Sequence, residues 1–168
     1  MTTDASILDD RVRAALTALG ASYEVLACAP ELADTGAFCE HYGISAEEAC
    51  NAIVVAMKTE PKRYVACVVR ADTKIDVNHK LSGIVGVKRL SFASAEETAN
   101  LTGMMIGGVT VFGLPAGIPL LIDTRVMERP TIIVGGGNRS SKVRIDPRLL
   151  LQLSDATIAD IAVSRAIP

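Results

Sequence analysis

The sequence predicts a single α/β (α+β) domain, in which a mixed, mostly antiparallel β-sheet is flanked by helices. Its 168 residues are 49% hydrophobic, which is enough to bury one compact core. Only 4% of the residues are aromatic and none is Trp, so aliphatic side chains must build the core, as suits buried strands. Short apolar runs alternate with amphipathic segments that begin at capping residues. Neither a linker nor an internal repeat interrupts this order, so residues 1–168 are expected to form one domain.

The first element is predicted to be an amphipathic helix over residues 7–19. Asp4 and Ser6 can cap its start, and Gly20 can end it. Its apolar side chains recur at helical spacing: Ile7, Leu8, Val12, Ala15, Leu16 and Leu19. A short strand over residues 23–27 follows.

A second helix is predicted over residues 36–42, after a loop that spans residues 30–35. Gly43 closes this helix, because glycine readily takes the left-handed conformation of a helix end. Ser45 and Glu48 then have the spacing of a capping box, in which each side chain bonds the other residue's backbone N–H. A short helix is therefore expected before the next strand.

The sheet is expected to be built on a hairpin. Residues 52–57, AIVVAM, form an apolar run that is too short for a helix and rich enough in β-branched residues for a strand buried on both faces. A turn over residues 59–62 connects it to a second strand over residues 63–70, RYVACVVR. These two strands anchor the predicted sheet.

Two further caps divide the middle of the chain. Asp76 can cap a helix that runs through Leu81, and residues 87–91 read as a strand. Ser94 and Glu97 then repeat the capping-box spacing. We expect a helix to begin there.

The stretch over residues 101–122 has no charged residue and is long enough for a membrane span of about 20 residues. Helix breakers interrupt it: Gly103, Gly107, Gly108, Gly113, Pro115, Gly117 and Pro119. A lipid-exposed helix with these breakers would leave backbone groups unpaired, so buried backbone is predicted instead, with strands over residues 101–106 and 118–123. The Gly107-Gly108 pair is a candidate pocket floor, where an added side chain would block the approach to the backbone. Bulges and turns explain the same glycines equally well.

A glycine-rich connection, GGGNR, follows a strand predicted over residues 131–134. The chain returns to a strand over residues 142–145, and a helix is expected over residues 146–153. A Rossmann fingerprint or a Walker loop would open a helix at this point, so both nucleotide-binding motifs have little support. What remains is a backbone nest beside Arg139 that can hold an anion, or simply a tight connection.

The cysteines and histidines do not have the spacing of a metal or redox site. Cys28, Cys39, Cys50 and Cys67 form no CxxC pair, so buried reduced thiols are predicted. His41 and His79 belong to no paired-His or HExxH motif, and no serine lies in GxSxG. A metal hydrolase or a serine-triad enzyme therefore has little support, and we expect solvated or locally bonded histidines.

Charge is distributed unevenly along the chain although the net charge is only -2. Residues 1–57 carry two basic and nine acidic side chains, whereas residues 58–89 carry eight basic and three acidic ones. The basic segment can contact a phosphate backbone, or it can be an ordinary solvated surface. The start, MTTDASILDDRV, is acidic where a targeting peptide would be basic, which predicts a cytoplasmic protein.

Four stretches together resemble the YbaK/ProX family of aminoacyl-tRNA editing proteins, which is related to the editing insertion of bacterial prolyl-tRNA synthetases. They are ADTGAFCEHYGISAEEACNAIVVAM, RYVACVV, LTGMMIGGVTVFG and IIVGGGNRSSKVRI, and the resemblance covers roughly residues 11–161. It implies a compact mixed sheet or barrel-like core with surrounding helices. It also implies hydrolysis, in trans, of the ester that joins a wrong amino acid to tRNA, without a metal or nucleotide cofactor.

The resemblance and the glycine motif together select the candidate site. The amides of Gly107 and Gly108 would bind the ester carbonyl as its oxyanion develops. Asn51 stands where active members commonly have a lysine and would donate a neutral hydrogen bond, although it can also be a strand-entry residue that bonds its own backbone. Substrate-binding residues are predicted at Met105, Ile106, Thr110, Phe112, Gly136 and Arg139. Contacts to tRNA are predicted at Lys58, Lys62, Arg63 and Lys80.

Two other functions fit the same residues. A homologue that has lost catalysis would bind aminoacyl-tRNA or dock on an aminoacyl-tRNA synthetase. A small-molecule sensor would bind an amino acid or metabolite in the pocket with no RNA, and salt-sensitive RNA binding separates this function from the others. No membrane or DNA partner is expected, and the sequence does not specify the amino acid, the tRNA or the oligomeric state.

Overall fold

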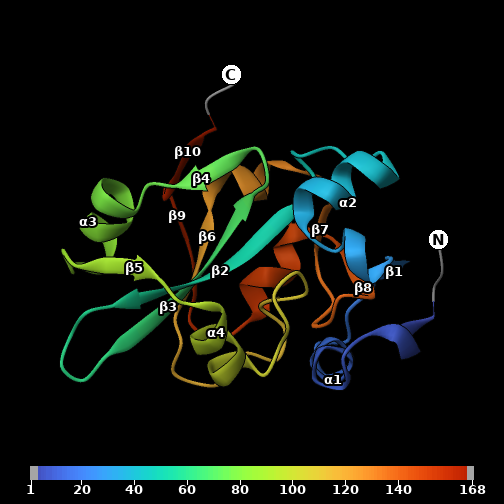
Figure 1. Cartoon of the computed structure of the whole chain (residues 1–168), viewed down its shortest axis with the longest axis horizontal. Coiled ribbons are helices and arrows are strands. Elements are labelled where there is room, and N and C mark those ends of the chain that lie inside the picture. The colour runs from blue at the N-terminus through green and yellow to red at the C-terminus, as the bar shows by residue number, and fades with distance from the viewer. Residues whose placement is uncertain (1–3, 166–168) are drawn as a thin grey trace.

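The computed structural model of the chain describes residues 4–165 (Figure 1). The first residues of the acidic start, and both ends of the predicted 1–168 domain, lie outside the described residues. Within residues 4–165, no helix is both long enough and apolar enough to cross a membrane.

Short helices and strands are interspersed along residues 4–165. The α-helices are α1 (Asp10–Ala18), α2 (Thr35–Tyr42), α3 (Ser82–Val85) and α4 (Ala95–Thr102), and the π-helical turn η3 (Val77–Leu81) precedes α3. The 3-10 helices are η1 (Ala5–Ile7), η2 (Pro30–Leu32), η4 (Thr124–Glu128) and η5 (Pro147–Gln152). The strands are β1 (Glu24–Ala27), β2 (Cys50–Met57), β3 (Arg63–Arg70), β4 (Thr73–Ile75), β5 (Leu90–Phe92), β6 (Leu120–Asp123), β7 (Ile132–Gly135), β8 (Ser141–Ile145), β9 (Ala156–Ala159) and β10 (Ala162–Ser164).

Three open sheets form the core. The largest has the strand order β5-β2-β3-β6-β9, a second has the order β1-β8-β7, and β10 pairs with β4. Strand β2 is antiparallel to both β3 and β5, whereas β6 is parallel to β3 and β9. The prediction of a mixed, mostly antiparallel sheet flanked by helices is confirmed, and none of the sheets formed by residues 4–165 closes into a barrel.

The predicted hairpin is confirmed, and β3 has the predicted bounds. Strand β2 pairs with β3 from Cys50 opposite Arg70 to Met57 opposite Arg63. Alternate residues of β2 lie in two different core clusters, with Cys50 in one and Val55 in the other. The sheet is therefore buried on both faces, as the apolar run predicted.

The predicted short helix after Gly43 is wrong, because only a single turn over residues 46–48 precedes β2. In this turn the N–H groups of Glu48 and Ala49 both donate to the Ser45 carbonyl at 3.0 Å, and the Ser45 hydroxyl accepts from the Glu47 N–H at 3.1 Å. The Glu48 carboxylate is used elsewhere, because it accepts from Thr131 at 3.0 Å and from Arg144 at 2.8 Å. Arg144, which is distant in the sequence, thus binds the Glu48 carboxylate in place of the local capping box.

The predicted strand over residues 101–106 is also wrong. The capping box at Ser94 and Glu97 does form, and the helix that it begins continues to Thr102. Gly103 ends α4 with a left-handed φ of 67°, and a loop follows. Predicted strands and helices elsewhere are present with shifted ends, while β4, β9 and β10 were not predicted.

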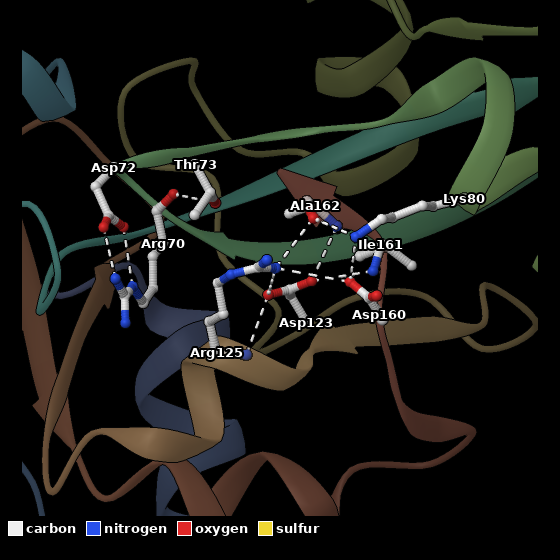
Figure 2. Close-up of polar contacts among 9 residues, drawn as sticks. All are labelled: Arg70, Asp72, Thr73, Lys80, Asp123, Arg125, Asp160, Ile161 and Ala162. Carbon is white, nitrogen blue, oxygen red and sulfur yellow. Dashed lines mark hydrogen bonds and ion pairs between the residues drawn. The ribbon is translucent and has the colours of Figure 1, made fainter. Parts of the chain in front are cut away.

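A buried carboxylate fastens the end of the chain to the large sheet (Figure 2). Asp123 is fully buried at the end of β6, and its Oδ2 accepts from the N–H groups of Ile161 and Ala162 at 3.0 Å each. Arg125 donates to the Ala162 carbonyl at 3.0 Å, and Lys80 donates to the same carbonyl at 3.0 Å. These bonds hold the segment between β9 and β10 against β6.

Three of the four thiols are buried, as predicted, and Cys39 is half-buried. Desolvation raises the pKa of Cys50 and of Cys67 to about 12, from an ordinary value of 9.0. Above pH 9 the unfolded chain therefore loses these protons while the folded chain keeps them, so the stabilisation present below pH 9 is lost as pH rises toward 12.

The unfolding free energy should thus fall by about 1.4 kcal/mol per pH unit for each buried thiol between pH 9 and 12. Urea denaturation across this range measures the slope. Cys67→Ala should make the slope of the unfolding free energy against pH shallower by the contribution of one buried thiol. Cys39→Ala should change this slope less. Equal slopes in wild type and Cys67→Ala would contradict the burial of this thiol.

Candidate functional site

A cavity of about 360 Å³ lies where the start of β2 meets the N-terminus of α2 and the glycine turn after α4. Strand β8 and the end of β7 complete its wall. The residues that line it are Asp34, Thr35, Cys50, Asn51, Ala52, Ile53, Val54, Ala93, Thr98, Ile106, Gly107, Val109, Gly135 and Lys142. The cavity therefore gathers segments that are far apart in the sequence.

Asn51 lies in this cavity, as the sequence predicted. It is the second residue of β2, and its Oδ1 accepts a hydrogen bond from the Thr35 hydroxyl at 2.5 Å. Because this bond fixes which side of the amide faces Thr35, the Nδ2 group is left free to donate. No residue within 4–165 accepts a hydrogen bond from Nδ2.

The two glycines of the predicted oxyanion site differ. Gly107 lines the cavity with a φ of +91°, and its N–H has no acceptor within residues 4–165. The Ile106 carbonyl accepts from Arg139 Nη1 at 2.8 Å, and the N–H of a trans peptide points away from the carbonyl. The Gly107 N–H is therefore directed away from Arg139 and is available.

Gly108 cannot have the predicted catalytic role, because its N–H already donates to the Met105 carbonyl at 2.9 Å. A side chain there would not block the cavity either. A Cβ on Gly108 would lie 2.1 Å from the carbonyl oxygen of Asn138, which is backbone. The absence of a side chain at Gly108 thus serves the packing of two chain segments.

The predicted substrate-binding residues separate into three groups. Ile106 lines the cavity, and Met105 is 56% exposed on the same loop but is not part of the lining. Thr110 and Phe112 are fully buried in the fold, and Gly136 is buried under Ser141, so these three predictions are wrong. Phe112 belongs to the main core, and Thr110 leaves its hydroxyl without a partner within residues 4–165.

Arg139 braces the cavity from outside. Its Nε donates to the Pro30 carbonyl at 3.0 Å, and its Nη1 donates to the Ile106 carbonyl and, at 3.1 Å, to Asp34. The predicted anion nest is therefore occupied by the protein itself. Arg139 holds two loops together, and Asp34 and Ile106 in those loops line the cavity.

Lys142, like Asp34 and Thr35, is a cavity residue that the sequence analysis missed. Lys142 is only 6% exposed, and its Nζ donates to the Ala33 carbonyl at 2.6 Å and to the Gly107 carbonyl at 2.8 Å. Desolvation lowers its pKa below the ordinary value of 10.5. The only sequence signal was the alternation of β8, in which Val143 faces the core while Lys142 points to the other side.

The profile of the aminoacyl-tRNA editing domain matches residues 29–153, which include Asn51, Gly107 and Lys142. The chain belongs to this family of aminoacyl-tRNA editing domains. The predicted resemblance to the YbaK/ProX proteins is thereby confirmed.

Solved structures share the fold of this editing domain. One is a crystal structure of a hypothetical protein, which is 25% identical, has a TM-score of 0.82, and aligns over 92% of this chain and 100% of its own. Another is a crystal structure of a candidate trans-editing enzyme for prolyl-tRNA synthetase. It is 24% identical with a TM-score of 0.80, and it aligns over 98% of this chain and 99% of its own.

The basic residues predicted to contact tRNA fall into two groups in this editing domain. Lys58, Lys62 and Arg63 lie at the end of the β2–β3 hairpin, where the Lys58 N–H donates to the Arg89 carbonyl at 2.9 Å. We call the exposed basic residues here the hairpin-end cluster; they are Lys58, Lys62, Arg63, Lys88 and Arg89. Lys80 lies outside it, and its ammonium bonds Asp160 at 2.7 Å (Figure 2).

The histidines of the editing domain are exposed. His79 bonds Asp76 at 3.1 Å, and the ring of His41 lies edge-on to Tyr42, so the prediction of solvated or locally bonded histidines is confirmed. Within the described part of the chain, no three His, Cys, Asp or Glu side chains come together as a metal site.

Proposed function

We propose that this editing domain is an aminoacyl-tRNA deacylase that acts in trans and hydrolyses the ester of a mischarged aminoacyl-tRNA. The observation that carries the proposal is the cavity in which Asn51 Nδ2 and the Gly107 N–H are both left unpaired. Donors without internal acceptors at one cavity suit a carbonyl oxygen that gains negative charge during ester hydrolysis.

The chemistry needs little more than positioning. Water attacks the carbonyl carbon, and the carbonyl electrons move onto the oxygen as an oxyanion. The oxyanion then collapses and the bond to the ribose oxygen breaks. The proton that the attacking water loses is passed to the ribose oxygen, directly or through a neighbouring tRNA hydroxyl, which leaves a free amino acid and a free ribose hydroxyl. Cys50 also lines the cavity, but the burial that raises its pKa to about 12 keeps it protonated and makes it a poor nucleophile.

The α-amino group of the substrate has one carboxylate to bind. Asp34 is the acidic residue among those that line the cavity, and its side chain is 69% exposed although it pairs with Arg139 at 3.1 Å. An ammonium on the aminoacyl group can share this carboxylate with the arginine. Asp34 would thus orient the ester between Asn51 and Gly107.

We propose that the hairpin-end cluster binds the acceptor stem of tRNA. Met57 lies six positions after Asn51 on β2, so the cluster lies about 20 Å from Asn51 along the strand. Figure 1 shows the hairpin projecting away from α2, where the cavity begins. Phosphates of the stem can therefore meet Lys58 and Arg63 while the aminoacyl end occupies the cavity.

Reversing two of these charges should weaken tRNA binding. Lys58→Glu with Arg63→Glu removes two phosphate contacts, and the slope of log affinity against log salt should become shallower by about 1.5 or more. Lys62 is left unchanged because it already pairs with Glu97. Filter binding over a salt titration measures the slope.

Lys74→Glu is the matched control, because Lys74 is equally exposed but lies on β4, away from the hairpin end. It should leave the salt slope near the wild-type value. The same slope in the double variant and in Lys74→Glu would exclude the hairpin-end cluster as the tRNA contact.

The activity is tested with a panel of misacylated tRNAs and the purified protein. The proline-specific tRNA carrying a wrong amino acid comes first, because one protein of the same fold is a candidate trans-editing enzyme for prolyl-tRNA synthetase. Hydrolysis of at least one member above the uncatalysed rate is expected. Binding without hydrolysis across the panel would favour a non-catalytic aminoacyl-tRNA-binding homologue, and neither binding nor hydrolysis would favour a small-molecule sensor.

A further inference from the structure

Two basic side chains connect the same two loops beside the cavity. Lys142 donates to the carbonyls of Ala33 and Gly107. Arg139 donates to the carbonyl of Pro30, in the same loop as Ala33, and to that of Ile106, which precedes Gly107. One loop leads into α2, and the other is the glycine turn after α4. Both loops line the cavity, so each cation braces two of its walls.

Lys142 and Arg139 differ in what neutralises them. Arg139 pairs with Asp34, whereas no ion pair within residues 4–165 includes Lys142. Its ammonium instead lies 5.4 Å from the centre of the Phe38 ring. Burying an ammonium without a carboxylate is unfavourable, and a neutral donor could bond the same two carbonyls at less cost. Bracing alone therefore does not explain a lysine at this position.

The ammonium has one hydrogen-bond donor to spare. A lysine carries three N–H donors, and the carbonyls of Ala33 and Gly107 use two of them. The third has no acceptor within the described chain, and Lys142 lines the cavity together with Asn51 and Gly107. The ammonium lies 2.8 Å from the carbonyl oxygen of Gly107, the same residue whose N–H is unpaired.

We infer that Lys142 is the cationic group of this catalytic site, and that its third N–H binds the ester carbonyl and stabilises the oxyanion. This inference rests on the proposed deacylase function and assigns to β8 the positive charge that Asn51 cannot supply from β2. Two carbonyls hold the ammonium in place before the substrate arrives. A preorganised cation in a desolvated cavity stabilises developing negative charge more strongly than it would in water.

The protonation state of Lys142 gives a readout that a purely structural role would not. Desolvation, and to a smaller extent the nearby Arg139, lowers its pKa below 10.5, while Cys28, Asp34 and Cys39 act in the opposite direction. The charged form is the one that binds the oxyanion. The wild-type kcat, corrected for uncatalysed hydrolysis, should therefore decrease as pH rises through the lowered pKa of Lys142.

Lys142→Met tests the inference, because methionine keeps most of the length without the charge. Its kcat should fall about 100-fold or more with a small change in KM, since the charge is needed mainly in the transition state. Its Tm reports the balance of two opposing effects, because an unpaired buried charge is removed while the carbonyls of Ala33 and Gly107 lose their donor. Any remaining activity should lack the alkaline decrease of wild type.

Arg148→Met is the matched control, because it also removes one positive charge but at a side chain that is 80% exposed and away from the cavity. It should keep the wild-type kcat and pH profile. A folded Lys142→Met that hydrolyses within threefold of wild type would overturn the inference and leave the deacylase function standing. If the variant does not fold, a wild-type kcat with no alkaline decrease below pH 10.5 would overturn it, and an inactive wild type would remove both proposals.

Discussion

Gly108→Ala should destabilise the fold by about 3 kcal/mol or more, rather than produce a folded protein with a blocked site. An added Cβ would lie 2.1, 2.4 and 2.6 Å from the carbonyl oxygen, carbonyl carbon and nitrogen of Asn138. All three are backbone atoms, so no side-chain rotation relieves the clash. The turns that carry Gly108 and Gly137 are also joined by a bond of 2.7 Å between the Gly137 N–H and the Gly108 carbonyl, which separation would break.

Urea denaturation of purified Gly108→Ala measures this loss, with Gly83→Ala as the control. Gly83 lies in α3 with a negative φ and nothing within 4 Å of an added Cβ. Alanine there should be neutral or stabilise by up to about 1 kcal/mol, because glycine weakens helices. Since domains of this kind have only about 5–15 kcal/mol of stability, Gly108→Ala can leave little folded protein. An unfolding midpoint equal to that of wild type would show that the Asn138 backbone moves aside easily.

The hairpin could be predicted because its signals are local and do not compete. An apolar run, a turn and a second apolar run allow one arrangement, and the bounds of β3 were predicted correctly. The strand predicted over residues 101–106 is wrong because the local signals there compete. Leu101 and Thr102 complete the helix that Ser94 begins, and Met105 and Ile106 lie exposed in the loop that follows it.

The candidate site was predicted only in part, because most of it depends on contacts between distant segments. Asn51 was found from its position in a family pattern, and Gly107 from the glycine pair. Which of the two glycines has a free N–H is decided by a turn that no residue pattern encodes. Lys142 looked like an ordinary strand residue, since nothing in SSKVRI indicates that α2 will cover it.

The polar contacts of Figure 2 show that charged residues, too, are difficult to place from the sequence. Lys80 lies within the basic segment of the sequence, yet the fold places it beside Asp160, eighty positions later. The basic residues of this segment thus separate into the hairpin-end cluster, the ion pairs of Arg70 and Lys80, and the exposed Lys74. A count of charges along the chain predicts the first group only where a hairpin brings strand ends together.

Asn51→Ala should lower the deacylation rate about 100-fold to 1000-fold, which is the usual effect of removing one well-placed donor from an oxyanion site. The Asn51 Oδ1 is held by the Thr35 hydroxyl at 2.5 Å, so the Nδ2 donor is fixed before the substrate binds. Single-turnover kinetics on the misacylated tRNA that wild type hydrolyses best would measure the rate. Binding of the same tRNA should change little, because the hairpin-end cluster is untouched.

Asn51→Asp tests whether the Nδ2 hydrogen-bond donor or only the shape of the side chain is required. The carboxylate has nearly the size of the amide and can still accept from Thr35, but it replaces the Nδ2 donor with a second acceptor that repels an oxyanion. It should therefore be as slow as Asn51→Ala or slower. If the alanine variant hydrolysed as fast as wild type, Asn51 would be a strand-entry residue that bonds Thr35, and oxyanion stabilisation would be left to Gly107 and Lys142.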